Sequence, residues 1–429
     1  MPKREYEWTD IENPPVIARH SLNKHEVLQN YLERYLDKLC VKGRSPRVVI
    51  VDGFAGGGIY KRTDTGDIHY GSPVLVMQTV QSMGPILEQK HGKKIELRPR
   101  FYFVEKKKQY LDTLRSVLDR LGLEPCVDGR GGLIRDQFEK VVGKIIDEIK
   151  SEGRSHKVLF ILDQYGYADV PKSTLNYIFD SLPQAEVFLT FAVDWLLDYL
   201  STKPDKIDEC RRRLRRLGVE MTVEEIIETR ESSPYGRLLI QELLSEELSR
   251  ACGAEYYTRY FIQTENAKGR QSHRSFWLVH MSRHPVARDE MLKVHWESAN
   301  HMSTHSGAVG IDEWGLGVLG YSTHQDEQLG QYNLNYNFDE LAEKQSIDEL
   351  LKDVPNIIWA RKAMTLSELM ELIGNHTPIS SEIMKKVMDV LLTSNDVLVV
   401  SADGKKRRKG NAMHWSDVIH AQTRCMFGF

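Results

Sequence analysis

The sequence predicts an α/β protein with a mostly parallel sheet, covered by helices on both faces, and a smaller C-terminal domain. Short apolar runs alternate with stretches of helical periodicity, as in βαβ units. These runs lack polar–apolar alternation, as expected for strands buried on both faces. Residues 346–429 read helix, helix, strand, basic turn, strand, which is the order of a winged helix. A chain of 429 residues also exceeds what one core usually supports.

Composition and charge are those of an ordinary globular protein. Hydrophobic residues make up 41% and charged residues 28% of the chain, which argues against disorder. The formal net charge of -3 leaves any nucleic-acid surface to a local patch. The five cysteines are scattered, as is typical of free thiols in a reducing compartment. With no apolar signal or membrane-spanning stretch, we expect a cytoplasmic protein with no membrane partner.

The elements follow in order along the chain. Residues 1–44 are expected to be an irregular arm and a helix, and residues 45–300 the main domain, with a charged helical insert at about 196–252. Strands are expected at 48–51, 100–105, 125–128, 158–162 and 186–191, and helices at 74–83, 108–121, 137–150 and 173–181. The runs 256–263 and 275–281 predict a terminal antiparallel hairpin. Residues 60–71 are expected to be a polar loop, and 301–345 an irregular linker.

The loop after the first strand carries the strongest functional signal. The strand ends in Asp52, and the loop consists of Gly53, Phe54, Ala55, Gly56, Gly57 and Gly58. A strand that ends in an acid and a glycine-rich turn before a helix is typical of nucleotide binding, because glycines allow close approach of a ligand. The pattern is neither a P-loop nor G-x-G-x-x-G. Alternatively, the glycines serve packing alone.

The form D-G-F-A-G-G-G resembles the first motif of class I S-adenosylmethionine-dependent methyltransferases, especially DNA-modifying members. The resemblance implies a Rossmann-like class I methyltransferase sheet, with the loop under the methionine part of S-adenosylmethionine and Asp52 nearby. It also implies that Glu105, at the end of the second strand, takes the ribose hydroxyls. Glu105 lies farther along the chain than the ~20 residues usual for such an acid. Alternatively, Glu105 is a solvated acid beside three lysines.

The fourth strand ends in D-Q-Y-G, which includes Asp163 and Tyr165. Amino-methyltransferases carry an acid or amide, two prolines and an aromatic residue at this place. The resemblance implies that Asp163 accepts a hydrogen bond from the target amine and that Tyr165 stacks on the base. Both prolines are missing, so a structural turn before the next helix is the alternative.

Residues 20–285 resemble a narrower family, the three-Cys-motif partner proteins (TcmP). The resemblance is carried by His20, Lys24-His25-Glu26, Leu28, Tyr31-Leu32, Asp52 to Gly56, Gly71-Ser72-Pro73, Glu105, Leu162-Asp163, Tyr165-Gly166 and residues 275–285. The family is bacterial and phage-associated, and its name implies a partner with a three-cysteine motif of the radical S-adenosylmethionine type. Gln164 stands where proline is expected. His20, Lys24 and His25 either close over the cofactor or bind phosphate, or they are a solvated helix start.

A basic run lies on the predicted wing. It consists of Lys405, Lys406, Arg407, Arg408 and Lys409. Five successive cations at a hairpin tip predict contact with a nucleic-acid backbone, and a solvated charged turn is the alternative.

These observations favour a TcmP-like, S-adenosylmethionine-dependent methyltransferase that acts on an amino group of a base in DNA or RNA. One alternative is a non-catalytic nucleic-acid-binding partner of a three-cysteine radical-S-adenosylmethionine-like protein, which the missing prolines motivate. The other is a methyltransferase for a protein or small molecule.

Overall fold

The structure is a computed structural model. It describes residues 6–41, 43–127, 129–153, 156–164, 169–232, 240, 243–244, 247–248, 250–265, 271–301, 340–374 and 377–422. The chain separates into two compact units, Met1–Ala287 and Arg288–Phe429.

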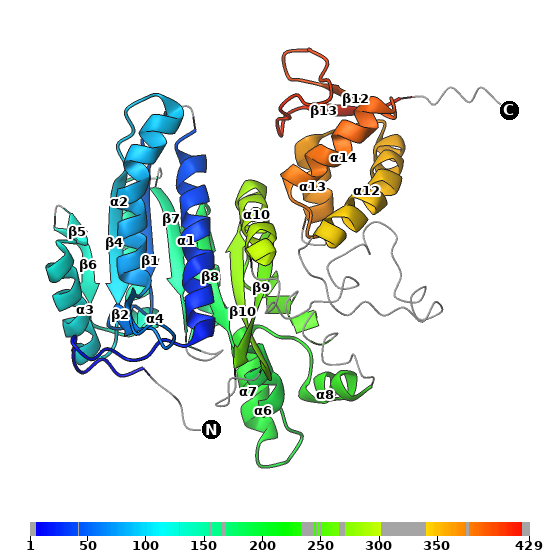
Figure 1. The fold of residues 1–429 in the computed structure, drawn as a ribbon. Helices are drawn as coiled ribbons and strands as arrows, with labels where there is room; N and C mark the ends of the chain where they lie inside the picture. Colours follow the sequence, from blue (N-terminus) through cyan, green and yellow to red (C-terminus); the bar gives the residue numbers. More distant parts are fainter. Residues whose placement is uncertain are drawn as a thin grey trace. The chain divides into compact units, whose positions relative to one another are not determined.

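A single large sheet organises the first unit (Figure 1). Eight strands of the described chain lie in the order β5-β6-β4-β1-β7-β8-β10-β9. Their bounds are β1 Arg47–Asp52, β4 Arg98–Val104, β5 Cys126–Val127, β6 Arg130–Ile134, β7 His156–Leu162, β8 Ala185–Phe191, β9 Tyr256–Glu265 and β10 Gln271–Ser282. The central strands β6, β4, β1, β7 and β8 are parallel, whereas β10 is antiparallel to both β8 and β9. This is the predicted class I methyltransferase-like sheet with its terminal hairpin.

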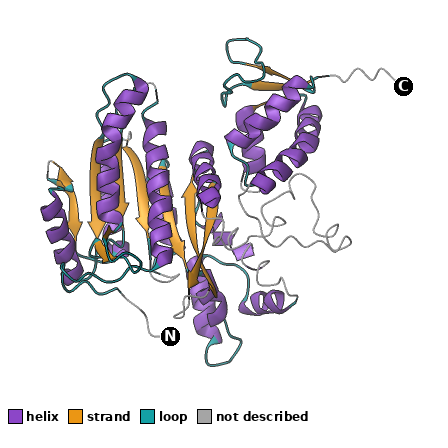
Figure 2. Cartoon of the chain, in the orientation of Figure 1, coloured by secondary structure: helices purple, strands orange, loops and turns teal. Residues whose placement is uncertain are grey.

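Helices cover both faces of this sheet (Figure 2). They are α1 Arg19–Leu39, α2 Ser72–His91, α3 Lys108–Leu121, α4 Phe138–Ser151 and α5 Lys172–Ser181, with α6 Val193–Tyr199, α7 Ile207–Leu217 and α8 Val223–Glu231 in the insert. On one face α1 and α2 lie side by side, and the Tyr31 ring of α1 packs edge-on against Phe188 of β8 at 5.1 Å. The apolar spacing that predicted α1 is therefore the stripe that it buries on the sheet.

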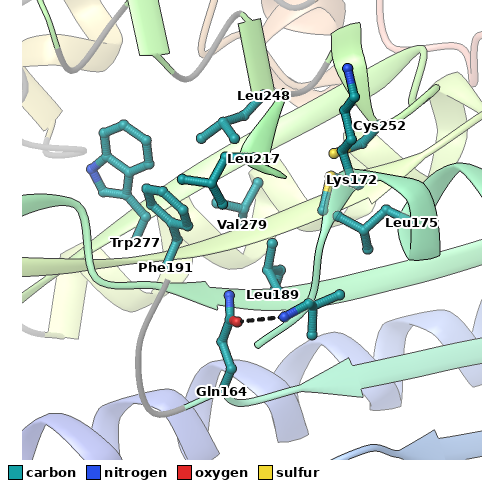
Figure 3. Close-up of a pocket in the computed structure, with 12 residues that line it drawn as sticks. Gln164, Lys172, Leu175, Leu189, Phe191, Leu217, Leu248, Cys252, Trp277 and Val279 are labelled. Carbon is teal, nitrogen blue, oxygen red and sulfur yellow. Dashed lines mark hydrogen bonds between the residues drawn. The ribbon is translucent and has the colours of Figure 1, made fainter. Parts of the chain in front are cut away.

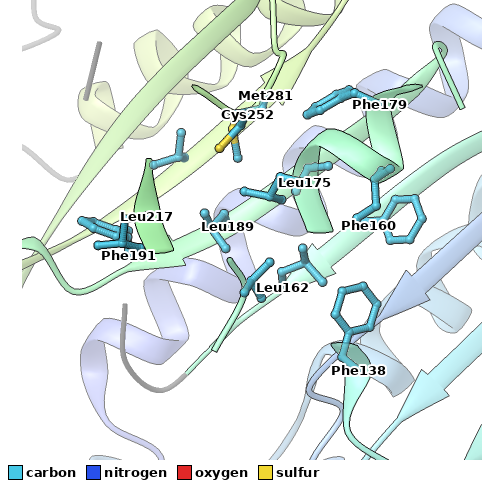
Figure 4. Packing of buried hydrophobic residues seen from close by; sticks show 14 of the residues in the cluster. Phe138, Phe160, Leu162, Leu175, Phe179, Leu189, Phe191, Leu217, Cys252 and Met281 are labelled. Atoms are coloured by element: carbon cyan, nitrogen blue, oxygen red, sulfur yellow. The ribbon is translucent and has the colours of Figure 1, made fainter. Parts of the chain in front are cut away.

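The opposite face carries the core that holds α4 and α5 (Figure 4). Alternate residues of β1 and β7, among them Val51 and Phe160, pack here with Phe138 of α4 and Phe179 of α5. All four side chains are at most 4% exposed. Burying one such side chain contributes roughly 1.5–3 kcal/mol to the stability of the fold. The apolar runs that predicted the strands therefore also hold the sheet in the core.

The prediction of a polar loop at 60–71 is wrong, because most of this segment is a short hairpin. Strands β2 Ile59–Lys61 and β3 Ile68–Tyr70 pair antiparallel, with Tyr60 opposite His69. The N-terminal arm adds to this hairpin: Ile17 N donates to Lys61 O at 2.9 Å, and Lys61 N donates to Pro15 O at 2.9 Å. Three-residue strands show no periodicity, and pairing with the distant arm stabilises them.

The second unit has the predicted winged-helix order. Its elements are α10 Pro285–His301, which begins in the first unit, α12 Glu340–Arg361, β11 Ala363–Thr365, α13 Leu366–Ile373, α14 Ser381–Thr393, β12 Val397–Val400 and β13 Val418–Ala421. The strands form a sheet in the order β11-β13-β12. Ser380 caps α14 by accepting from Ile383 N, and Thr365 forms a capping box with Glu368 at the start of α13.

The boundaries of this unit differ from the expected ones. Most of α10 belongs to the second unit rather than ending the first domain at residue 300. Its side chains explain why: Asp289 accepts from Ser381 N at 2.6 Å, and Trp296 Nε1 donates to Pro378 O at 2.8 Å. Helix α12 begins at Glu340, before the expected start at 346, and residues 302–339 of the predicted linker lie outside the described residues. No helix in the described ranges is long and apolar enough to cross a membrane.

Candidate functional site

Three adjacent strands deliver carboxylates to one edge of the sheet. Asp52 ends β1, Glu105 follows β4 and Asp163 follows β7, and these strands are neighbours in the order β4-β1-β7. Because the strands are parallel, their carboxyl ends meet at the same edge, where ligands of α/β sheets bind. The fold thus brings together the three acids that the sequence singled out.

The protein's own packing requires glycine in the loop that follows Asp52. Gly56 and Gly58 have φ of 60° and 70°, in the left-handed region. A Cβ on Gly57 would lie 2.3 Å from Trp8 Cγ, and one on Gly53 would lie 2.8 Å from Leu162 Cδ2. The glycines alone are therefore not evidence for a cofactor, because backbone geometry and internal contacts already demand them.

Trp8, a residue that was not selected from the sequence, covers one side of this loop. Its side chain is 6% exposed, and its Nε1 donates to Ile59 O at 2.6 Å. Its ring lies edge-on to Tyr60 at 5.3 Å and Tyr110 at 4.9 Å. The predicted irregular arm is thus anchored on the glycine loop through an aromatic cluster. A tryptophan in an otherwise polar arm was the signal available in the sequence.

Asp52 is a structural member of the site. Its carboxylate is fully buried and accepts from Phe54 N at 3.0 Å and from Ser72 Oγ, at the start of α2, at 2.6 Å. Burial raises the pKa of Asp52 to about 7, with smaller contributions from Asp163 and Glu105. Asp52 therefore ties the loop to α2 and changes charge near neutral pH.

Glu105 joins the glycine loop to the end of β4. Its Oε2 accepts from Gly56 N at 3.2 Å and its Oε1 from Lys107 N at 2.8 Å. The residue is 9% exposed, so it is not the solvated acid of the alternative interpretation. A carboxylate oxygen has two lone pairs, so each oxygen can accept one further hydrogen bond.

Asp163 is held by a lysine from the first helix. Both of its oxygens accept from Lys24 Nζ, at 2.6 and 2.7 Å. The Lys24 side chain is 13% exposed and that of Asp163 35%. Burial works to raise the pKa of Asp163, but the Lys24 ammonium outweighs it and holds that pKa below the usual value. Lys24 is therefore a mostly buried partner of Asp163 rather than a solvated residue at the start of the helix.

The histidines around this ion pair are uncharged at neutral pH. Burial lowers the pKa of His20 to about 4 and that of His25 to about 3, with smaller contributions from Lys24 and, for His25, from His69. His25 Nδ1 lies 2.9 Å from His69 Nε2, which links α1 to the β2–β3 hairpin. The His20 ring stacks on Phe276 at 5.5 Å. Because neutral imidazole rings bind phosphate weakly, phosphate binding by His20 and His25 is disfavoured.

The predicted stacking residue Tyr165 lies outside the described residues, but its neighbour Gln164 is informative. Gln164 is 1% exposed, and its Oε1 accepts from Asp169 N and Val170 N, both at 3.0 Å. It borders an apolar hollow also lined by Leu189 and Phe191 (Figure 3). Gln164 thus ties the end of β7 to the segment that leads into α5.

The predicted wing cations divide into two groups. Arg407 is structural: its Nε and Nη2 donate to the carboxylate of Asp417 at 2.9 and 3.1 Å, and Asp417 is 1% exposed. The other four side chains are exposed. They are Lys405, Lys406, Arg408 and Lys409. Of these, Lys405 pairs with Asp403 at 2.9 Å across the wing turn.

Metal-binding side chains do not gather in the described part of the chain. No group of three or more His, Cys, Asp or Glu residues there is placed to hold a metal ion. Cys40, Cys126, Cys210 and Cys252 are free thiols.

The second unit matches a family model described as a GMT-like wHTH domain, over residues 320–404. This match and the observed element order agree on a winged helix-turn-helix. A search of curated proteins finds no match.

Several solved structures are similar to the chain. Protein LPL1258 from Legionella pneumophila shares 10% identity, with 65% of this chain and 90% of that chain covered and a TM-score of 0.36. A putative rRNA-methylase from Clostridium thermocellum shares 13%, with 62% and 98% covered and a TM-score of 0.26. An O-methyltransferase from Bacillus cereus in complex with SAH shares 12%, with 59% and 80% covered and a TM-score of 0.26. These TM-scores are too low to support a fold assignment, which rests instead on the strand order of the sheet in the first unit.

Proposed function

We propose that the protein is an S-adenosylmethionine-dependent methyltransferase that acts on an amino group of a base in nucleic acid. The observation that carries the proposal is the position of Glu105 in a methyltransferase-like sheet. It is a buried carboxylate at the end of the strand beside β1, hydrogen-bonded to the glycine loop itself. An acid and a glycine loop at the carboxyl ends of neighbouring strands are the features of a nucleoside-binding site in this class of sheet.

The residues present are compatible with this cofactor. Glu105 keeps an acceptor site on each oxygen for the two ribose hydroxyls. Trp8 fills the space that side chains at Gly56 and Gly57 would take, so the loop would meet a ligand through its backbone atoms. When bound, S-adenosylmethionine supplies a methyl group on a positively charged sulfur. The protein's part is to orient the cofactor and exclude water, and the aromatic cluster of Trp8, Tyr60 and Tyr110 closes one side of the loop against solvent.

The second unit supports a nucleic-acid target. Lys405, Lys406, Arg408 and Lys409 project from the wing of a winged helix-turn-helix. Exposed cations of this kind bind phosphates without reading sequence and give affinity that falls with salt.

A non-catalytic role is the second candidate. The D-Q-Y-G sequence lacks the prolines of amino-methyltransferases, and Asp163 is engaged by Lys24 rather than open to a target amine. In this case the sheet binds a partner, such as the three-cysteine-motif protein that the TcmP resemblance implies, and the wing brings it to nucleic acid.

Calorimetric titration of the full chain with S-adenosylmethionine tests the proposal. Wild type should bind, and Glu105→Gln should bind about tenfold to a hundredfold more weakly, because a charged acceptor for two hydroxyls is lost. Glu96→Gln is the matched control, since Glu96 is exposed and pairs with nearby Arg98. Binding by wild type, followed by methyl transfer to DNA or RNA, supports the enzyme. No binding by wild type favours the non-catalytic role.

A further inference from the structure

The three carboxylates at the sheet edge differ in whether a ligand could replace their hydrogen-bond donors. Asp52 and Glu105 accept from groups within the loop and its flanking elements: Phe54 N, Ser72 Oγ, Gly56 N and Lys107 N. Replacing those donors would undo the loop. Asp163, in contrast, is paired with the end of a long, flexible lysine side chain. A ligand can take that ammonium's place without a change in the backbone.

The positive charge beside Asp163 belongs to Lys24. The basic side chains His20, His25 and His69 stand near it on α1 and β3, and burial lowers the pKa of each. At neutral pH they are therefore neutral rings. Among the described side chains that contact Asp163, Lys24 therefore carries a positive charge that can pair with a ligand's carboxylate.

The sheet sets the distance between the two ends of a bound cofactor. Glu105 and Asp163 follow β4 and β7, on either side of β1 and its glycine loop. Neighbouring strands lie about 4.8 Å apart, so these two acids stand roughly 10 Å apart across the loop. A nucleoside whose ribose sits at Glu105, and whose tail crosses the loop, brings the end of that tail to Lys24 and Asp163.

We propose that the Lys24–Asp163 ion pair is the receptor for the amino-acid end of the cofactor: Lys24 binds its carboxylate and Asp163 its ammonium group. The inference rests on the proposed function and deepens it. In the free protein the two side chains neutralise each other, and in the complex each pairs with the opposite charge of the ligand. No unpaired charge is left buried in either state, which is the condition for an exchange of this kind to be favourable.

This assignment changes the role expected of Asp163. The sequence resemblance implied that Asp163 faces the target amine, whereas the ion pair places it with the cofactor. Asp163 and Lys24 are then binding residues, and orientation of the target amine rests with other groups.

Two ligands that differ only in the amino-acid part test the inference. S-adenosylhomocysteine carries the zwitterion, and 5′-methylthioadenosine has the same nucleoside and thioether without it. Calorimetric titration of the full chain should show that wild type binds S-adenosylhomocysteine at least tenfold more tightly. Lys24→Met and Asp163→Asn should each reduce that preference tenfold or more, while the affinity for 5′-methylthioadenosine stays within twofold. Lys24→Arg should keep the preference.

Each other outcome has a distinct meaning. A preference that survives in Lys24→Met or Asp163→Asn overturns the receptor role and leaves the proposed function standing. Equal losses for both ligands show that the pair only holds the fold, and thermal melting of the two variants identifies that case. If wild type binds neither ligand, the proposed function itself fails and the receptor falls with it.

Discussion

The carboxyl edge of the sheet and the wing of the second unit use charge in opposite ways. At the sheet edge, Asp52 is fully buried and Lys24 is 13% exposed, and each is hydrogen-bonded or paired inside the protein. On the wing, the Lys405 side chain is 82% exposed, and Arg407 alone among the five predicted cations is held by a buried acid. Charge in the first region is little screened by salt, whereas charge in the second is open to counterions. The buried charges at the sheet edge suit a preformed binding site for a small molecule. The exposed charges on the wing suit salt-dependent contact with a charged polymer.

The pH dependence of stability gives the largest test of this contrast. Burial raises the pKa of Asp52 from 3.8 to about 7, so between these values the native state holds a proton that the unfolded chain releases. The unfolding free energy of the first unit should therefore fall as pH rises through this window, by about 1.4 kcal/mol per unit and by about 4 kcal/mol in all. Asp52→Asn should remove that part of the slope.

Urea denaturation of wild type and Asp52→Asn at several pH values between 4.5 and 7.5 measures the difference. Because the two proteins differ only at position 52, the difference between their slopes reports the contribution of this carboxyl. Parallel slopes in the two proteins would mean that Asp52 is ionised in the native state.

Substituting one glycine in each region compares how much a side chain destabilises the two regions, because both glycines have the left-handed backbone conformation. Gly58 has a φ of 70° and would place a Cβ 2.5 Å from Leu114 Cδ1, whereas Gly404 on the wing has a φ of 80° and no described atom within 4 Å of such a Cβ. The left-handed conformation costs alanine about 1–2 kcal/mol, and a core clash adds about 1–3 kcal/mol. Gly58→Ala should thus destabilise by about 3 kcal/mol and Gly404→Ala by about 1 kcal/mol.

Chemical denaturation followed by circular dichroism measures both changes. Gly122→Ala is the control within the first unit, since Gly122 has a φ of 64° and open space around it. If Gly58→Ala costs no more than Gly122→Ala, the loop is looser than its packing against Leu114 implies.

The smallest expected changes in stability distinguish the structural cation of the wing, Arg407, from the exposed ones such as Arg408. Asp417→Ala removes the acceptor of Arg407 and of His414 N, and should destabilise the second unit by about 2 kcal/mol. Arg408→Gln should change stability by less than about 0.5 kcal/mol. Arg408→Gln should instead lower the slope of log affinity for a DNA or RNA duplex against log salt by about 1.

Thermal melting and fluorescence titration at several salt concentrations separate the two variants. A loss of stability in Arg408→Gln, or an unchanged salt slope, would contradict the division between structural and exposed cations.

The acids of the site could be found from the sequence, but their surroundings could not. Asp52, Glu105 and Asp163 each end an apolar run, and such runs are visible as local pattern. The partner of Asp163 is Lys24, 139 residues away in the chain. A resemblance to three-Cys-motif partner proteins raised Lys24 as a residue that closes over the cofactor or binds phosphate, but no periodicity indicates which side chain it meets.

The same limit explains the hairpin and Trp8. The β2–β3 hairpin is stabilised by pairing with the N-terminal arm, and Trp8 packs on Gly57 and Tyr60. These contacts join segments whose own sequences are short, polar or irregular. Neither segment carries enough local signal to be assigned alone.

By itself, the sequence determined the α/β alternation, the strand ends with their acids, the glycine loop and the winged-helix order. Each of these depends on local backbone preference and on which side chains repeat on one face. Only the tertiary structure decided that Trp8 covers the loop, that Lys24 neutralises Asp163 and that Arg407 serves the fold instead of a ligand. These depend on burial and on charges brought together from distant segments, and the free energy of a charged side chain is set by those surroundings.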